Sequence, residues 1–262
     1  MKRLFKLYVA FFRANLIRFF TYRGNFWFNF LLTALESVLL YIGVAILFTH
    51  ITSIAGWSYQ DMLVLIGVFM ICNTLSWLLF RAGVNDLDMI INKGDLDWYL
   101  IKPADTQLLI TFQRIDIQDS GRAVVGILAI IVGLQGSSVF SAIINLPAFF
   151  VTILMGQLVL YSISLAIKTV SFKSIQGWAT AAISWRFFEL AHYPTDIYFG
   201  VMRMIYTFVF PLVFVATVPA KALQGDLPLH LFLGSIVAAL CALMITRLIW
   251  KRALGSYSSA SS

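Results

Sequence analysis

One polar stretch, NKGDLDWYLIKPADT at residues 92–106, is set in a strongly apolar chain. It holds three acids, two lysines, a glycine and a proline, which surround Leu96, Trp98, Tyr99 and Leu100. Trp and Tyr are enriched at protein interfaces, where charged residues border an apolar centre. Two interpretations are equally open at this point: the stretch recognises a protein partner, or Trp98 and Tyr99 anchor it at lipid headgroups, as aromatic belts do.

The second candidate for chemistry is an acid inside an apolar segment. Glu36 lies near the middle of such a segment, and Asn29, Thr33 and Gly43 share its face at helical spacing. A charge at the bilayer centre costs at least about 2.5–3.5 kcal/mol, so this face should contact protein or water. Two interpretations stay open: a lining for a substrate path, or a buried, hydrogen-bonded packing group.

Other polar residues in apolar segments are weaker candidates for a pathway or for the interior of a dimer. They are Asn73, Gln157 and Arg203. For Asn73 and Gln157, packing between helices is the favoured interpretation, because polar side chains often join membrane helices.

Several kinds of active site are missing from the sequence. There is no G-x-x-x-x-G-K-[ST] phosphate loop, so we expect no ATP site and no enzymatic activity in this chain. His50, His192 and His230 lack ligand spacing, and both cysteines lie in apolar runs, so we expect neither a metal nor a structural disulfide. No cofactor is predicted. The net charge of +7 is explained by attraction to the inner leaflet, so nucleic acid is not a predicted partner.

The elements that must position these residues are membrane helices. Of 262 residues, 60% are hydrophobic and 12% charged, and apolar runs reach the length of about 20 residues that crosses a bilayer. The sequence predicts an all-α integral membrane protein with a transmembrane domain over 25–250. Its six predicted spans are residues 25–49, 60–81, 120–136, 142–167, 198–219 and 229–250. The apolar run of the third span, Ala123 to Leu134, is short for a bilayer, so its helix is expected to begin earlier than Ala123, among the charges of QRIDIQDSGR.

The remaining segments are predicted to flank or connect the spans. Residues 1–24 form an amphipathic interfacial helix, which is retained rather than cleaved, and 251–262 form a cytoplasmic tail. Residues 82–106 form a cytoplasmic loop with a helix-break-helix element, broken at Gly94 and ended by Pro103. Pro211 and Pro219 predict a kinked or re-entrant outer end of the fifth span.

The basic residues predict the orientation. With both termini in the cytoplasm, Lys221 is the one basic residue of 19 that falls in an outside loop. Segment 174–192 is apolar but carries Arg186 and Glu189. A crossing there, added to the six, would move Arg247 and its neighbours outside, so we expect this segment to lie along or dip into the cytoplasmic side.

Three stretches carry a family resemblance. GDLDWYLIKP resembles the G-x-L-D-x-x-L-x-K-P signature of permease subunits of ATP-binding-cassette (ABC) exporters, in the bacterial type-II export branch. Residues 193–220 resemble the Y-P…R…F-x-x-P…P-A segment of that branch, and SYSSASS resembles its closing tail. The signature residues here are Gly94, Leu96, Asp97, Leu100, Lys102 and Pro103.

The resemblance implies a role for the polar stretch. It would supply a coupling helix that seats in a groove of an ABC ATPase subunit. The implied coupling residues are Lys93, Gly94, Asp95, Leu96, Asp97, Trp98, Tyr99, Leu100, Lys102 and Pro103. The ATPase, in two copies, would bind ATP and Mg. A second permease, a different homologue, would complete the pathway in the bacterial cytoplasmic (inner) membrane, and the complex would export a hydrophobic or amphipathic substrate.

Two rival functions stay open. One is a membrane-embedded, lipid-modifying enzyme that uses Glu36, Arg203 or His192. The other is a proton-coupled secondary carrier with Glu36 as its proton site, although the chain shows no internal inverted repeat.

Overall fold

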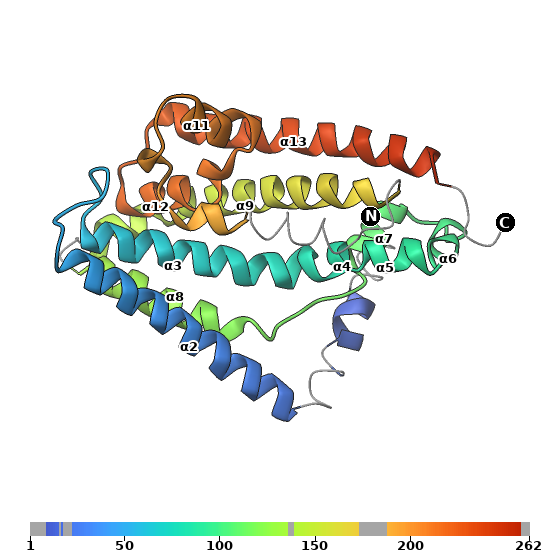
Figure 1. Cartoon of the computed structure of the whole chain (residues 1–262), viewed down its shortest axis with the longest axis horizontal. Coiled ribbons are helices and arrows are strands. Elements are labelled where there is room, and N and C mark those ends of the chain that lie inside the picture. The colour runs from blue at the N-terminus through green and yellow to red at the C-terminus, as the bar shows by residue number, and fades with distance from the viewer. Residues whose placement is uncertain (1–8, 16, 18–22, 136–138, 173–187, 258–262) are drawn as a thin grey trace.

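The helices of the protein run between two poles. The computed structural model describes residues 9–15, 17, 23–135, 139–172 and 188–257. One end, called here the α6 pole, carries the short helices α5 (Leu87–Asn92), α6 (Leu96–Leu100) and α7 (Thr106–Phe112). The opposite end, the α12 pole, carries the turn between α2 and α3 together with α12 (Thr217–Gln224) (Figure 1).

Four helices among the described residues are long and apolar enough to cross a membrane. They are α2 (Arg23–Phe48), the helix that begins with α3 (Tyr59–Ser76), α9 (Val139–Lys168) and α13 (Leu229–Gly255). They cover the predicted spans 25–49, 60–81, 142–167 and 229–250. The Ser58 hydroxyl and the Asp61 carboxylate form a capping box that starts α3.

The second of these helices is longer than the sequence predicts. After α3 it continues through a π-helical turn, Trp77–Arg81, and α4, Ala82–Asn85, into α5. Its whole length runs from Tyr59 to Asn92. The first part of the predicted loop 82–106 is therefore a direct extension of a membrane helix, and the break follows at Gly94, whose φ is +76°.

The third predicted span, 120–136, is realised as a short helix. Helix α8 spans Ser120–Gly133, 14 residues or about 21 Å, against a hydrocarbon core of about 30 Å. The helix begins at Ser120, within QRIDIQDSGR as expected and three residues before the apolar run at Ala123, whereas residues 113–119 are not helical. There the Asp116 carboxylate accepts a hydrogen bond from the Gln118 backbone N–H (2.9 Å), a local turn that competes with helix formation.

The fifth predicted span, 198–219, does not cross between the poles. Residues Gly200–Val209 and Leu212–Gln224 form a helix pair bent by 68°. Its two ends meet, because the Thr195 N–H donates to the Thr217 hydroxyl (3.3 Å) and the Lys221 ammonium donates to Asp196 (2.9 Å). The sequence left a kinked or a re-entrant outer end open, and the contacts between the two ends favour the re-entrant alternative, extended to the whole segment. The break lies at Pro211, whereas Pro219 lies in the first turn of α12, where proline is tolerated.

Segment 174–192 lies mostly outside the described residues, and so does the prediction made for it. Before it, Phe172 packs against Trp250 at the α6 pole (ring centroids 5.6 Å apart). At its described end, Phe188 packs against Phe69 on α3 (4.9 Å). Thr195, which follows, lies at the α12 pole.

The predicted terminal segments are described in part. Residues 9–15 are helical, and the Asn15 amide donates to the Gln113 carbonyl (3.3 Å). Positions 23 and 24 of the predicted interfacial helix belong to α2, and residues 1–8, 16 and 18–22 lie outside the described residues. Helix α13 continues to Gly255, and residues 258–262 of the tail also lie outside them.

Glycines permit a close approach between the backbones of α3 and α8. An added Cβ on Gly67 of α3 would lie 2.6 Å from the Gly126 carbonyl oxygen of α8, and one on Gly126 would lie 2.8 Å from the Gly67 oxygen. Small residues permit such backbone approach in membrane helices. By contrast, a Cβ on Gly43 of α2 would meet nothing within 4 Å, because that face of α2 is open.

We expect Gly67→Ala to destabilise the protein by about 1–3 kcal/mol, since the new methyl group must push α3 and α8 apart. Gly43→Ala is the matched control and should be neutral or stabilising by up to about 1 kcal/mol, because alanine favours the helix. The midpoint of thermal unfolding in detergent measures both. Equal midpoints for the two variants would show that the α3–α8 contact is not as tight as described.

Cysteine labelling can check the course of the chain. In a background without Cys72 and Cys241, cysteines at Phe199 and Asp226 should react with an impermeant reagent from one side, and a cysteine at Lys93 from the other. Phe199 is 82% exposed, so access is not limiting. The basic residues add that position 226 faces outside. Reaction of positions 199 and 93 from the same side would refute the re-entrant course.

Candidate functional site

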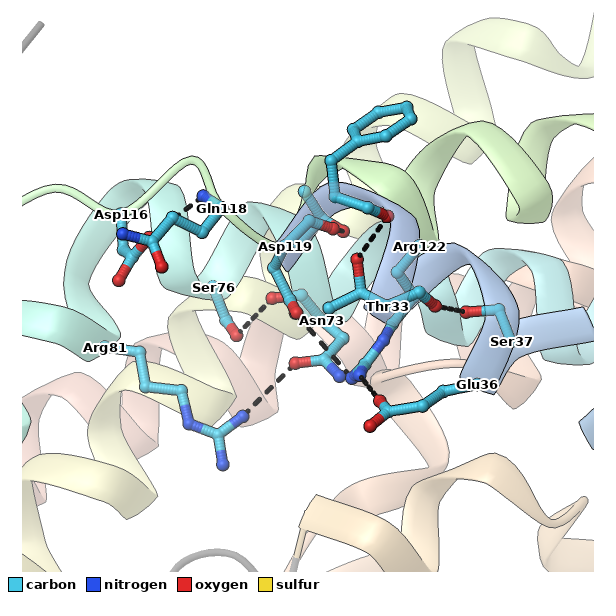
Figure 2. Close-up of polar contacts among 12 residues, drawn as sticks. Thr33, Glu36, Ser37, Asn73, Ser76, Arg81, Asp116, Gln118, Asp119 and Arg122 are labelled. Carbon is cyan, nitrogen blue, oxygen red and sulfur yellow. Dashed lines mark hydrogen bonds and ion pairs between the residues drawn. The ribbon is translucent and has the colours of Figure 1, made fainter. Parts of the chain in front are cut away.

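A charged cluster joins α2, α3 and α8 halfway along the membrane helices (Figure 2). Glu36 of α2 pairs with Arg122, in the first turn of α8, at 3.2 Å. The acid that the sequence places inside an apolar segment thus has a basic partner on a neighbouring helix. The Arg122 side chain is 15% exposed, whereas that of Glu36 is 56% exposed, so one face of the pair stays open.

The first turn of α8 lies directly on the backbone of α2. A Cβ on Gly121 would come within 2.0 Å of the Phe30 carbonyl oxygen, so a glycine is needed here. The Thr33 hydroxyl, which lies beside Gly121, donates to the same carbonyl (3.2 Å). On the other side of Arg122, the Asp119 carboxylate is 3.6 Å from its guanidinium. Arg122 is therefore held between two acids.

The α3 side of the cluster contributes a second arginine. Arg81 is 5% exposed, and its guanidinium donates to the Asn73 side-chain oxygen (3.3 Å). It also lies over the rings of Trp77 and Phe188, at 5.1 and 4.5 Å from their centroids. The Thr74 hydroxyl donates to the Asp119 carbonyl (3.0 Å), which ties α3 to the start of α8. Figure 2 shows Arg81, Asp119 and Arg122 in one neighbourhood.

The cluster lies where the helical structure of α8 stops. The backbone of residues 113–119 is irregular and half-buried, and at membrane depth such backbone needs protein or water around it. The open face of Glu36 and the half-buried Asp116 and Gln118 provide polar surface of this kind. The arrangement can hold a polar group against two arginines and three acids within an otherwise apolar layer.

The structure unites some of the predicted pathway residues and separates others. Thr33, Glu36 and Asn73 share the cluster. Asn29 bonds within α2 to the Asn25 carbonyl (2.7 Å). Gln157 is 3% exposed and donates to the Cys72 carbonyl (3.0 Å), as the packing interpretation expects.

Arg203 lies far from this cluster, at the α12 pole. It pairs with Asp196 at 3.2 Å, and Asp196 also accepts from the Trp57 indole N–H (3.0 Å). Burial alone would raise the pKa of Asp196, but the hydrogen bonds from Lys221 and Trp57 and the nearby positive charges together lower it. These contacts fasten the turn before α3 to the re-entrant segment, beside a cavity of about 360 Å³.

The three groups named for an enzyme therefore do not share a centre. Glu36 is paired with Arg122 and Arg203 with Asp196, while His192 packs on the ring of Phe69 at 5.6 Å. Sequence reasoning missed Arg122, Asp119 and Arg81, because each was read as part of a span boundary. The one feature of the sequence that could have identified these three residues was their charge at the edges of apolar runs.

The α6 pole presents the predicted coupling residues. Trp98 is 65% exposed and Ile101 is 72% exposed. The exposed members of the predicted set are Lys93, Asp95, Trp98, Leu100, Lys102 and Pro103. Leu96, by contrast, is fully buried, so its side chain supports α6 from within and the expectation of an exposed Leu96 is wrong.

The α6 surface is supported by contacts of Tyr99 with the chain after α7 and with Lys102. The Tyr99 hydroxyl bonds to the Gln113 side-chain oxygen, and the Lys102 ammonium lies 4.8 Å from the centre of the Tyr99 ring. A cavity of about 310 Å³, whose lining includes Met89, Trp98, Tyr99 and Lys102, adjoins this surface. An apolar centre with charged neighbours on a rigid support is the anatomy of a protein-binding surface.

Comparisons with known proteins agree with these features. Residues 34–261 match the protein family described as ABC-2 family transporter protein. The comparison with curated proteins and that with solved structures gave no match. Since the family match covers most of the chain, from the middle of α2 to the tail, the protein belongs to the ABC-2 family of transporter proteins.

Proposed function

We propose that this chain is the permease subunit of an ATP-driven exporter and is moved by a separate ABC ATPase. The observation that carries the proposal is the exposed surface at α6, which includes Trp98 and Ile101. This surface follows directly after the longest of the described membrane helices, Tyr59–Asn92. Family membership supports a role in membrane transport. The ATPase, in two copies, binds ATP and Mg and docks on α6.

We further propose that a second permease, a different homologue, covers the open face of α2. Glu36 is half-exposed at mid-membrane, where contact with acyl chains would be costly, so water or protein must lie against it. Trp27, Leu31 and Leu35 on α2 are also exposed, which supplies apolar area for a partner helix. The complex lies in the bacterial cytoplasmic membrane with both termini inside, as the basic residues favour.

The Glu36–Arg122 cluster is the proposed lining of the translocation path, together with Asn29 and Thr33. A hydrophobic or amphipathic substrate would keep its apolar part among the apolar side chains and its polar part against this cluster. Asn73, Gln157 and Arg203 fit this role less well, because the first two are buried in packing and Arg203 lies at the α12 pole.

Trp98→Ala should weaken capture of the ATPase by roughly 30-fold, since buried tryptophans at interface centres contribute about 2 kcal/mol or more. Phe199→Ala is the control, an exposed aromatic residue (82%) at the opposite pole, away from both α6 and the open face of α2. Binding of the purified ATPase to the permease in nanodiscs gives both affinities. Unchanged affinity after Trp98→Ala would place the docking surface elsewhere.

Glu36→Gln should leave assembly with the partners intact but abolish transport or substrate-stimulated ATP hydrolysis, because it keeps a hydrogen-bond acceptor for Arg122 and removes the charge. Glu36→Leu removes both and should also impair assembly. If the pair only holds α2 on α8, Gln should behave like the wild type, and the exchange Glu36→Arg with Arg122→Glu should restore function. That result would end the pathway assignment for Glu36.

A further inference from the structure

A buried ion pair at the α6 pole has no part in docking or in the proposed path. Lys168, the last residue of α9, donates to the carboxylate of Asp88 on α5, and the Ser171 hydroxyl donates to the other oxygen of that carboxylate. Lys168 is 1% exposed and the Asp88 side chain 12%. Removing such charges from water costs several kcal/mol each, so good geometry is needed to offset it.

A second polar connection ties the other side of α6 to the bundle. Arg247 of α13 donates to Asp105, the N-cap of α7, and to the Gln107 side-chain oxygen (2.6 Å). The Gln107 amide donates to the Tyr161 hydroxyl of α9 (2.8 Å). Burial would raise the pKa of Asp105, but hydrogen bonds from Arg247 and the Leu108 N–H, with the charge of Arg247, lower it.

The two connections flank α6 in the chain and lead to the same pair of helices. The α5 connection reaches α9, and the α7 connection reaches α13 and α9. Helix α8, by contrast, is separated from α7 by the irregular residues 113–119. Figure 1 shows α9 and α13 side by side above α5–α7, with α2 diverging from the bundle. A displacement of α6 is therefore transmitted to α9 and α13 through rigid contacts. Its transmission to α2 depends on less rigid contacts.

We propose that Asp88 and Lys168 are positioning residues that transmit movement of α6 to α9, an inference that rests on the proposed function of an ATPase-driven permease. A three-way hydrogen-bonded ion pair fixes the angle and register between α5 and α9. An apolar contact of equal volume would stabilise the fold as well but would allow the two helices to slip, because apolar packing is non-directional.

The test replaces both charges, because a single replacement would leave the other one buried without its partner and could unfold the protein. Asp88→Leu with Lys168→Met keeps the volume and should fold and capture the ATPase as the wild type does. Spin labels at Phe150 of α9 (62% exposed) and Leu39 of α2 (57% exposed) report the distance between the two helices in the permease–ATPase complex. ATP with vanadate traps the nucleotide-bound state.

In the wild type, we expect trapping to shift the distance between the labels. In the double variant we expect this shift to be lost although the ATPase stays bound. Asp86→Asn with Arg114→Gln is the control, since it removes a partly exposed ion pair at the same pole (3.0 Å) and should keep the shift. A shift of wild-type size in the double variant, or none in the wild type, overturns the transmission role. Failure of any ATPase to bind the wild type refutes the proposed function itself.

Discussion

The hydrocarbon core of a membrane offers no hydrogen-bond partner, so charges and irregular backbone at that depth must be satisfied within the protein. In this chain the constraint acts most strongly at the start of α8, where the helix stops about a third of the way short of a full crossing. Arg122 is held there between Glu36 and Asp119, and Gly121 lets the backbones of α2 and α8 touch. The position of α2, and hence the open face of the cluster, follows from these contacts.

The same constraint explains how the two poles differ. At the α12 pole, Asp196 accepts a hydrogen bond from Trp57 and forms ion pairs with Lys221 and Arg203. These contacts hold the re-entrant segment against the turn before α3. At the α6 pole, ion pairs join α5 and α7 to α9 and α13 and leave α6 free to face outward. The α12 pole is thus held together by its own polar contacts. The α6 pole is arranged to bind a partner and to transmit the movement of that partner to the helices.

The sequence predicted features that depend on local composition. The long apolar helices, the break at Gly94 and the break at Pro211 all follow from neighbouring residues. It did not predict that residues 198–219 return to the pole from which they start, because hydropathy shows that a segment is apolar but not whether it crosses or returns. Nor could it find the partner of Glu36, since Arg122 lies 86 residues away and a lone acid carries no sign of where its counter-ion will be. Leu96 was misplaced because a short helix buries one face, and spacing alone does not say which.

The central claim is that the α6 pole couples this permease to a separate ATPase. The most direct measurement is ATP hydrolysis by the tagged full chain, purified from its native membrane into nanodiscs, together with identification of the proteins that accompany it. The account expects a second polypeptide with a phosphate-binding loop, and ATP hydrolysis that disappears when that polypeptide is removed. A stable, monodisperse preparation from native membranes that contains no ATPase and hydrolyses no ATP would contradict it.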